Sequence, residues 1–503
     1  MKKIKLCAFM IAVSFMYGAA TKAATSDAEE IAKMLSTIHG AEVKANIDND
    51  KCEVIYPETE VIDNMLMALQ AAGAKIDTND AKDLIPETRA ECRKVADFNS
   101  HPQYEITVTS PNKLKAQLYN QLKFAFIKDL TAASMKEEIR VVPELGIMSY
   151  GKIHLDDVAI TQKDKTTGLK REVGNLRSYD LQQQVMEEAG QVKYEVDNSM
   201  DGFNLVLPIF SVQLQSQKQR SEVVYDVPSE GEFDYRDLIK SVPFLQTAKS
   251  SALFSGMKIG VALFGVSVGF DMDIKSNVQR AEDESLYILG QIKFDKTVFG
   301  GELIDANAQP KSIILKYSIK DISKEIAVEF GKIPEKSDDD SEEAKAARDL
   351  QIADLLDKVA EQAKLAANFE VNFAAADIKG NFDMERRNGY LHGVGKITVN
   401  NLFNIFPNQK QCANNPQADR LPECANPILA SLKDVIDTSK NNSETIYKFT
   451  EQGVFKNGVK IGDPIELNFR KMSLEMHAKD MEKQARMEDM MKAMGQAGDL
   501  QQP

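Results

Sequence analysis

The sequence lacks the spaced motifs by which many enzymes and metal-binding proteins are recognised. Its five histidines form no H-E-x-x-H pair, and its glycines form neither a P-loop nor a dinucleotide-binding pattern. Its five cysteines contain no C-x-x-C spacing, which disfavours a zinc site. These absences favour a protein without catalytic activity, but they leave open an enzyme site that is assembled from residues distant in the sequence.

Long apolar runs are also lacking beyond the N-terminus. There, three lysines precede an apolar run at residues 6–17, and small residues follow it. This order is typical of a secretory signal peptide, with cleavage after Ala20 or Ala23. We therefore expect a signal peptide at residues 1–23, a periplasmic or otherwise extracytoplasmic protein, and no transmembrane segment after cleavage. Retention of the signal as an anchor is the alternative.

Basic residues are too few to balance the acidic ones. The chain has 62 lysines and arginines against 76 aspartates and glutamates, which gives a net charge of −14. A chain this acidic repels nucleic acid over most of its surface. We therefore expect no nucleic-acid partner.

The cysteines fit an exported protein. Cys7 lies within the predicted signal peptide, and Cys52, Cys92, Cys412 and Cys424 remain. An even number of cysteines in an exported chain predicts disulfides, and four cysteines allow three pairings. We favour Cys52 with Cys92 and Cys412 with Cys424, because each pair lies within one region of the chain.

Most of the chain after residue 140 alternates between apolar and other residues with the period of a β-strand. The alternating apolar residues are Phe203, Leu205, Leu207 and Ile209; Phe264, Val266, Val268, Phe270, Met272 and Ile274; Leu286, Ile288, Ile292 and Phe294; and Ile313, Leu315, Tyr317 and Ile319. Such alternation over several segments predicts a mostly antiparallel sheet with one apolar face and one wetter face.

Two Asn-Gly pairs predict tight hairpin turns, because asparagine and glycine adopt the positive φ angles that these turns require. The pairs are Asn388-Gly389 and Asn457-Gly458. We expect the strand before the second turn at residues 447–455.

Helical periodicity marks shorter segments. Apolar residues spaced three and four apart predict helices at residues 31–38, 61–72 and 114–126. A longer helix is predicted at residues 341–367. An acidic run that begins at Ser337 supplies the negative charge that favours a helix N-terminus, and an apolar stripe should dock the helix on the sheet.

Together these patterns predict an α+β fold. We expect a mainly antiparallel, elongated and curved β-sheet with packed helices, preceded by a small α/β unit. The length of 503 residues fits two or three domains. We place the α/β unit, closed by the first disulfide, at residues 24–100, the extended β-rich region at residues 101–470, and a Met-rich C-terminal helix and tail at residues 471–503.

One segment matches the sequence pattern of a catalytic motif. Residues 265–269, Gly-Val-Ser-Val-Gly, fit G-x-S-x-G, which forms a nucleophile elbow only where a strand turns sharply into a helix. Here the strand alternation continues to Ile274, so we expect Ser267 to lie in an ordinary strand. His154 lies close to Asp156 in the sequence, but we interpret this segment too as a strand with its turn.

The C-terminus is rich in methionine. Met487, Met490, Met491 and Met494 have the spacing that places them on one face of a helix. Thioethers bind Cu(I), so a copper site is one interpretation. Methionine also fills irregular contacts and adaptable binding faces, and we favour this packing or partner-binding interpretation.

Two segments of the second half resemble the YdgA-like bacterial periplasmic proteins, a family of uncharacterised function. They are FEVNFAAADIKGNFDMERRNGYLHGVGKITVNNLFNIF, which begins at Phe369, and TIYKFTEQGVFKNGVKIGDPIEL, which begins at Thr445. The pattern extends over about residues 222–469. The first hundred residues, the cysteine pairs and the Met-rich tail depart from it. The resemblance implies an envelope protein with an extended β architecture, and it implies no site residues.

These observations favour a non-enzymatic cell-envelope protein that presents an extended β-sheet surface or groove to a lipid or protein partner. The alternatives are a secreted hydrolase whose site the sequence does not reveal, and Cu(I) binding by the C-terminal helix. We assign no catalytic, cofactor-binding or metal-binding residues.

Overall fold

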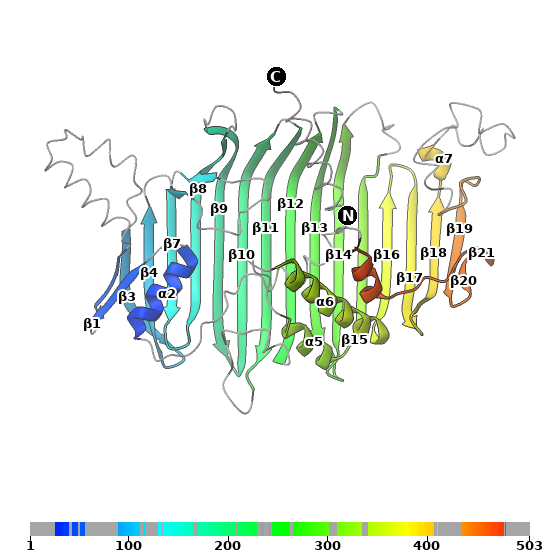
Figure 1. Ribbon diagram of the computed structural model, residues 1–503. Helices are drawn as coiled ribbons and strands as arrows, with labels where there is room; N and C mark the ends of the chain where they lie inside the picture. The colour runs from blue at the N-terminus through cyan, green and yellow to red at the C-terminus, as the bar shows by residue number, and fades with distance from the viewer. Residues whose placement is uncertain are drawn as a thin grey trace, which may run out of the picture.

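The structure is a computed structural model of the chain. It describes residues 26–39, 43–48, 51–55, 89–110, 114–115, 129–132, 134–163, 170–207, 209–228, 233, 235, 241, 244–261, 265–300, 309–333, 341–406, 410, 432, 435–476 and 478. Within these residues 21 strands form one sheet, which is wider across its strands than along them (Figure 1). The prediction of a mainly antiparallel, elongated sheet is therefore confirmed.

The strands follow one another across the sheet in chain order, and all neighbours pair antiparallel. Two short strands, β5 and β6, continue the lines of β4 and β7. The strands are β1 (Lys44–Asp48), β2 (Lys51–Ile55), β3 (Arg89–Phe98), β4 (His101–Ser110), β5 (Leu114–Lys115), β6 (Asp129–Ala132), β7 (Ser134–Val142), β8 (Ile147–Lys163), β9 (Lys170–Glu188), β10 (Gln191–Val206), β11 (Phe210–Asp226), β12 (Leu245–Val261), β13 (Val266–Arg280), β14 (Leu286–Gly300), β15 (Ser312–Ile322), β16 (Lys364–Asn372), β17 (Asp377–Arg387), β18 (Tyr390–Asn400), β19 (Ser443–Thr450), β20 (Gly453–Lys456) and β21 (Val459–Gly462).

Both predicted Asn-Gly turns are confirmed. Asn388 and Gly389 join β17 to β18 with φ angles of 51° and 81°. Asn457 and Gly458 join β20 to β21 with φ angles of 50° and 84°. These left-handed conformations match the twist of the flanking strands, so the chain returns at once beside its previous strand.

A line of irregular residues crosses the sheet from β8 to β12. Asp157, Gly202 and Gly256 lie at matching positions of alternate strands, with φ angles of 46°, 68° and 63°. Such positions shift the alternation of a strand. Met200 and Phe203, on opposite sides of the line, are therefore both buried on the same face. In β10, side chains alternate between the two faces on each side of this line, but the alternation shifts by one residue where the strand crosses it.

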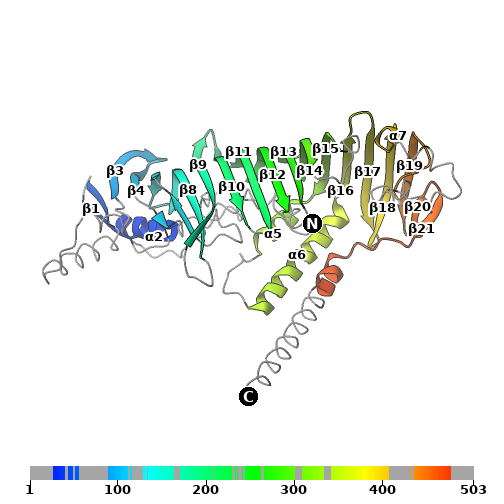
Figure 2. The same ribbon diagram turned by 90° about the horizontal axis from the view of Figure 1, so that it is seen from above.

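Three helices lie on one side of the sheet: α2 (Asp27–His39), α5 (Lys324–Gly331) and α6 (Glu342–Gln362). Figure 2, which views the molecule from above, shows all three on the same side. We call this side the helix face and the opposite side the open face. A short helix, α7 (Leu402–Ile405), follows β18 near the ends of the strands (Figure 1).

The buried core lies on the helix face in three clusters. In the first, Ile31 and Leu35 of α2 pack on β4 to β11. In the second, Ile326 of α5 and Val359 of α6 pack on β10 to β15. The third cluster surrounds Leu402 of α7 on β17 to β19. The helices therefore cover three different parts of the helix face, and α5 and α6 share the second.

The long predicted helix forms, but its predicted end at residue 367 is wrong. It begins as expected, since the Ser341 hydroxyl accepts a hydrogen bond from the Ala344 N–H at 3.2 Å. It ends at Gln362 because Ala363 has extended backbone angles. The following residues pair with β15 and β17 as β16.

Three smaller predictions are also wrong. The strand expected at residues 447–455 is broken, because β19 ends at Thr450 and a turn leads into Gly453, whose φ is 136°. The helix expected at residues 114–126 is wrong at Leu114, which lies in β5. Ile209 lies outside β10 and is 61% exposed.

The separate α/β unit at residues 24–100 and the α+β label are not confirmed. The described strands of that region, β1 to β3, belong to the same sheet as the rest, since β3 pairs with β4. The predicted signal peptide, the helix expected at residues 61–72 and the Met-rich face lie outside the described residues. None of the described helices combines the length and the apolar character that a membrane span requires.

Candidate apolar binding surface

Two rows of apolar side chains lie beside each other on the helix face of β12 to β16. The members of each row are direct neighbours across the strands. We call them the apolar strip, and they are Phe254, Met272, Phe294 and Ile313 in the first row and Ile274, Ile292, Leu315 and Phe369 in the second. Because side chains of a strand alternate between faces, the register alone places these eight on one side.

The apolar strip lies between the three buried clusters but is not itself fully buried. Phe254 packs against the first cluster and Phe369 against the third. The side chains between them are half-buried, and Leu315 is 37% exposed. The ring of Phe294 meets that of Phe270 edge-on, with 5.4 Å between ring centres. The apolar strip is therefore an ordered surface that retains contact with solvent.

Glycines help to position the aromatic rings in and beside the apolar strip. Gly380 lies directly opposite Phe369 in the ladder, and Gly290 lies directly opposite Tyr317. A Cβ atom at either glycine would collide with the facing ring. Each ring therefore lies flat over the backbone of the neighbouring strand, which makes the surface smooth at these positions.

Polar but uncharged residues border the apolar strip. Gln217 and Gln219 of β11 lie beside its first strand. The next row towards α5 and α6 contains Ser250, Ser276 and Tyr317. Burial raises the pKa of the Tyr317 hydroxyl, so this group stays protonated and can donate a hydrogen bond. These residues can offer amides and hydroxyls to a ligand.

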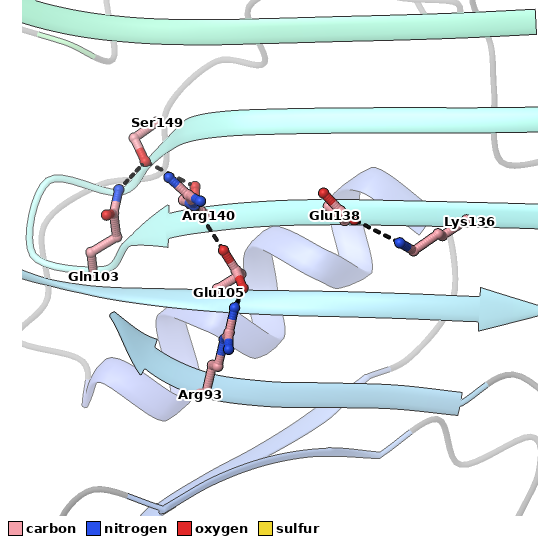
Figure 3. A network of polar contacts seen from close by, with 7 residues as sticks. All are labelled: Arg93, Gln103, Glu105, Lys136, Glu138, Arg140 and Ser149. Carbon is pink, nitrogen blue, oxygen red and sulfur yellow. Dashed lines mark hydrogen bonds and ion pairs between the residues drawn. The ribbon is translucent and has the colours of Figure 1, made fainter. Parts of the chain in front are cut away.

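The open face has a different chemistry, because ion pairs link its strands. In Figure 3, Glu105 of β4 accepts hydrogen bonds from Arg93 of β3 and from Arg140 of β7. The Arg93 hydrogen bond, followed by that of Arg140, holds the pKa of Glu105 below its usual value against the effect of burial. Such cross-strand pairs are typical of a solvated sheet face.

A depression on the open face has mixed charge as well. Its lining includes Asp180, Asp197, Lys218 and Arg220. Acidic and basic groups alternate here and neutralise one another, so the depression favours water over an apolar ligand. The apolar strip is the better candidate for a binding surface.

His154 lies between two carboxylates on the open face. Its Nδ1 is 2.7 Å from Asp180, and its Nε2 is 3.0 Å from Asp156. Both ring nitrogens are thus occupied, whereas a histidine that activates a nucleophile needs one nitrogen free. The arrangement is an ion-paired cross-strand contact and supplies no general base.

His154 makes stability depend on pH. The Asp180 hydrogen bond, followed by the charges of Asp180 and Asp156, raises the pKa of His154 above its ordinary value of 6.5. Its stabilisation is therefore complete below that value and is lost as pH rises through the higher folded-state pKa. Because the site is partly exposed, we expect less than about 1 kcal/mol. Thermal unfolding of His154→Gln should differ from that of the wild type at low pH and converge with it at high pH. A constant difference at every pH would contradict this.

The predicted disulfide between Cys52 and Cys92 is confirmed. The two residues lie directly opposite each other on β2 and β3, with Cα atoms 5.1 Å apart. Cys412 and Cys424 lie outside the described residues, as do the four methionines proposed for Cu(I). No cluster of three metal-binding side chains occurs among the described histidines, cysteines, aspartates and glutamates.

The expectation that Ser267 lies in an ordinary strand is confirmed. Ser267 is the second residue of β13, it is exposed, and it lies opposite Gly300 of β14. The strand continues to Arg280 without the sharp turn into a helix that a nucleophile elbow requires.

Sequence patterns missed a polar junction that holds the C-terminal part of the chain on α6. The Asp357 carboxylate of α6 accepts hydrogen bonds from the N–H groups of Phe469 and Arg470 at 3.0 and 3.1 Å. The Arg386 guanidinium lies 3.2 Å from the same carboxylate, and Arg470 binds both carboxylate oxygens of Asp354. These residues are far apart in the sequence, so no local pattern could have revealed the junction.

Comparisons with protein-family models, with curated proteins and with solved structures found no match. The described residues define a protein with one wide antiparallel sheet that carries α2, α5 and α6 on one face.

Proposed function

We propose that this chain is a non-enzymatic, exported cell-envelope protein whose sheet presents an apolar surface to a partner. The observation that carries the proposal is the apolar strip, which is uncharged and half-exposed on the otherwise well-packed helix face. Exposed apolar surface bordered by polar residues is typical of binding sites. The resemblance to YdgA-like periplasmic proteins, likewise a proposal, is consistent with this role.

The proposal predicts that the apolar strip binds a small apolar probe. N-phenylnaphthylamine, whose fluorescence rises in apolar surroundings, should bind the wild-type protein saturably. Leu315→Glu should weaken this binding at least about tenfold, since burying an unpaired carboxylate beside the probe costs more than about 1.4 kcal/mol.

Ser318→Glu is the matched control, because it adds the same charge to the same strand. Ser318 lies opposite Leu289 and Ala366 on the open face, so this variant should bind the probe like the wild type. Equal binding by all three proteins, or none by the wild type, would contradict the proposal.

A further inference from the structure

We infer that the occupant of the apolar strip is the acyl chain of a membrane lipid, which lies across strands β12 to β16. This inference rests on the proposed function and names the partner of the same surface. Its evidence is the size of the apolar strip, its lack of charge and the polar groups along its border.

The length of the apolar strip suits an acyl chain. Five neighbouring strands span four spacings, or about 19 Å at roughly 4.8 Å each. One leaflet contributes about half of the ~30 Å hydrocarbon thickness of a bilayer, so its acyl chains extend about 15 Å. A single acyl chain can therefore lie along the rows from Phe254 to Phe369 without passing beyond them.

The area of the apolar strip is too small for a second protein. Two rows occupy a width of about 13 Å, which gives an area of roughly 250 Å². A stable protein–protein interface buries about 800 Å² on each partner. A second copy of this chain would have to use surface outside the apolar strip for most of its contact, whereas a lipid chain needs only a narrow apolar path.

The border suits the polar end of a lipid. The Ser250 and Ser276 side chains lie in the row next to the apolar strip, and Tyr317 continues that row. Their hydroxyls can donate hydrogen bonds to ester oxygens, which would otherwise lose their water on binding. The net charge of −14 disfavours an anionic headgroup, so we choose a zwitterionic lipid as the probe.

The chain contains no tryptophan, which permits a direct test. Leu315→Trp places the sole tryptophan in the apolar strip, and Ser318→Trp places it on the open face of the same strand. Each full-length variant is mixed with phosphatidylcholine vesicles whose acyl chains are brominated, because bromine quenches tryptophan by contact. We expect loss of most emission for Leu315→Trp and little loss for Ser318→Trp.

The outcomes separate this inference from the proposed function. Equal quenching of both variants, or quenching of neither, overturns the lipid assignment. If N-phenylnaphthylamine still binds Ser318→Glu more tightly than Leu315→Glu, the proposed apolar binding surface is supported and only the assignment of a lipid as its occupant is wrong. If it does not, both proposals fail. A blue shift of Leu315→Trp that grows with protein concentration, with dimers in sedimentation, would assign the surface to a second copy instead. Ile292→Trp serves as the reporter if Leu315→Trp does not fold.

Discussion

Replacing Arg386 with methionine is expected to lower the free energy of unfolding by about 3 kcal/mol, because it leaves the Asp357 carboxylate without its cation in a partly buried junction. The Arg386 side chain is 9% exposed and that of Asp357 is 18% exposed. The loss of stability should be largest where α6 contacts the C-terminal part of the chain. Urea unfolding measures its size, and hydrogen exchange at residues 469–476 measures its location.

The neighbouring residue provides the control. Arg387 points to the open face, is 65% exposed and pairs with Glu385. Arg387→Met removes the same charge from a solvated pair, so it should cost less than about 1 kcal/mol. If both variants unfold at the same urea concentration, the junction does not stabilise the protein as the structure implies.

Removal of the Cys52–Cys92 disulfide should have a comparable effect at the other end of the sheet. The bond closes a loop of sequence separation 40 between β2 and β3. Opening a loop of this size releases chain entropy in the unfolded state, and we expect a loss of about 4 kcal/mol for Cys52→Ala combined with Cys92→Ala. Faster hydrogen exchange of the backbone amides of β1 to β4 would measure this loss of stability.

Reduction supplies the matching control for this prediction. A reductant should destabilise β1 to β4 in the wild type by a similar amount and should leave these strands of the double variant unchanged. A double variant with wild-type exchange rates would show that packing of α2 on the first cluster holds these strands without the covalent bond.

Local patterns predicted much of the sheet, because the period of two and the Asn-Gly turns depend on near neighbours. Met272 and Ile274 share a face as expected, and the turn at Gly389 forms as expected. The shift at Gly202 could not be predicted, because it depends on the register of neighbouring strands. The end of α6 was misplaced because Ala363 is a good helix former whose extended conformation follows from the pairing of β16.

The candidate surface was predictable only in part. Alternation placed Phe294 and Leu315 on an apolar face, but it could not show which part of that face the helices leave accessible. That depends on where α5 and α6 pack, which is a tertiary property. The junction of Asp357 with Arg386 could not be predicted either, because it also depends on where α6 packs.

Analysis of the lipid that copurifies with the protein would show whether the apolar strip binds acyl chains. The wild-type protein, Leu315→Glu and Ser318→Glu would be purified from an envelope fraction, and their lipids extracted and measured by mass spectrometry. We expect similar amounts of acyl lipid with the wild type and Ser318→Glu, and loss of this lipid from Leu315→Glu. Equal lipid in all three proteins, or none in the wild type, would contradict a lipid-binding role for the apolar strip.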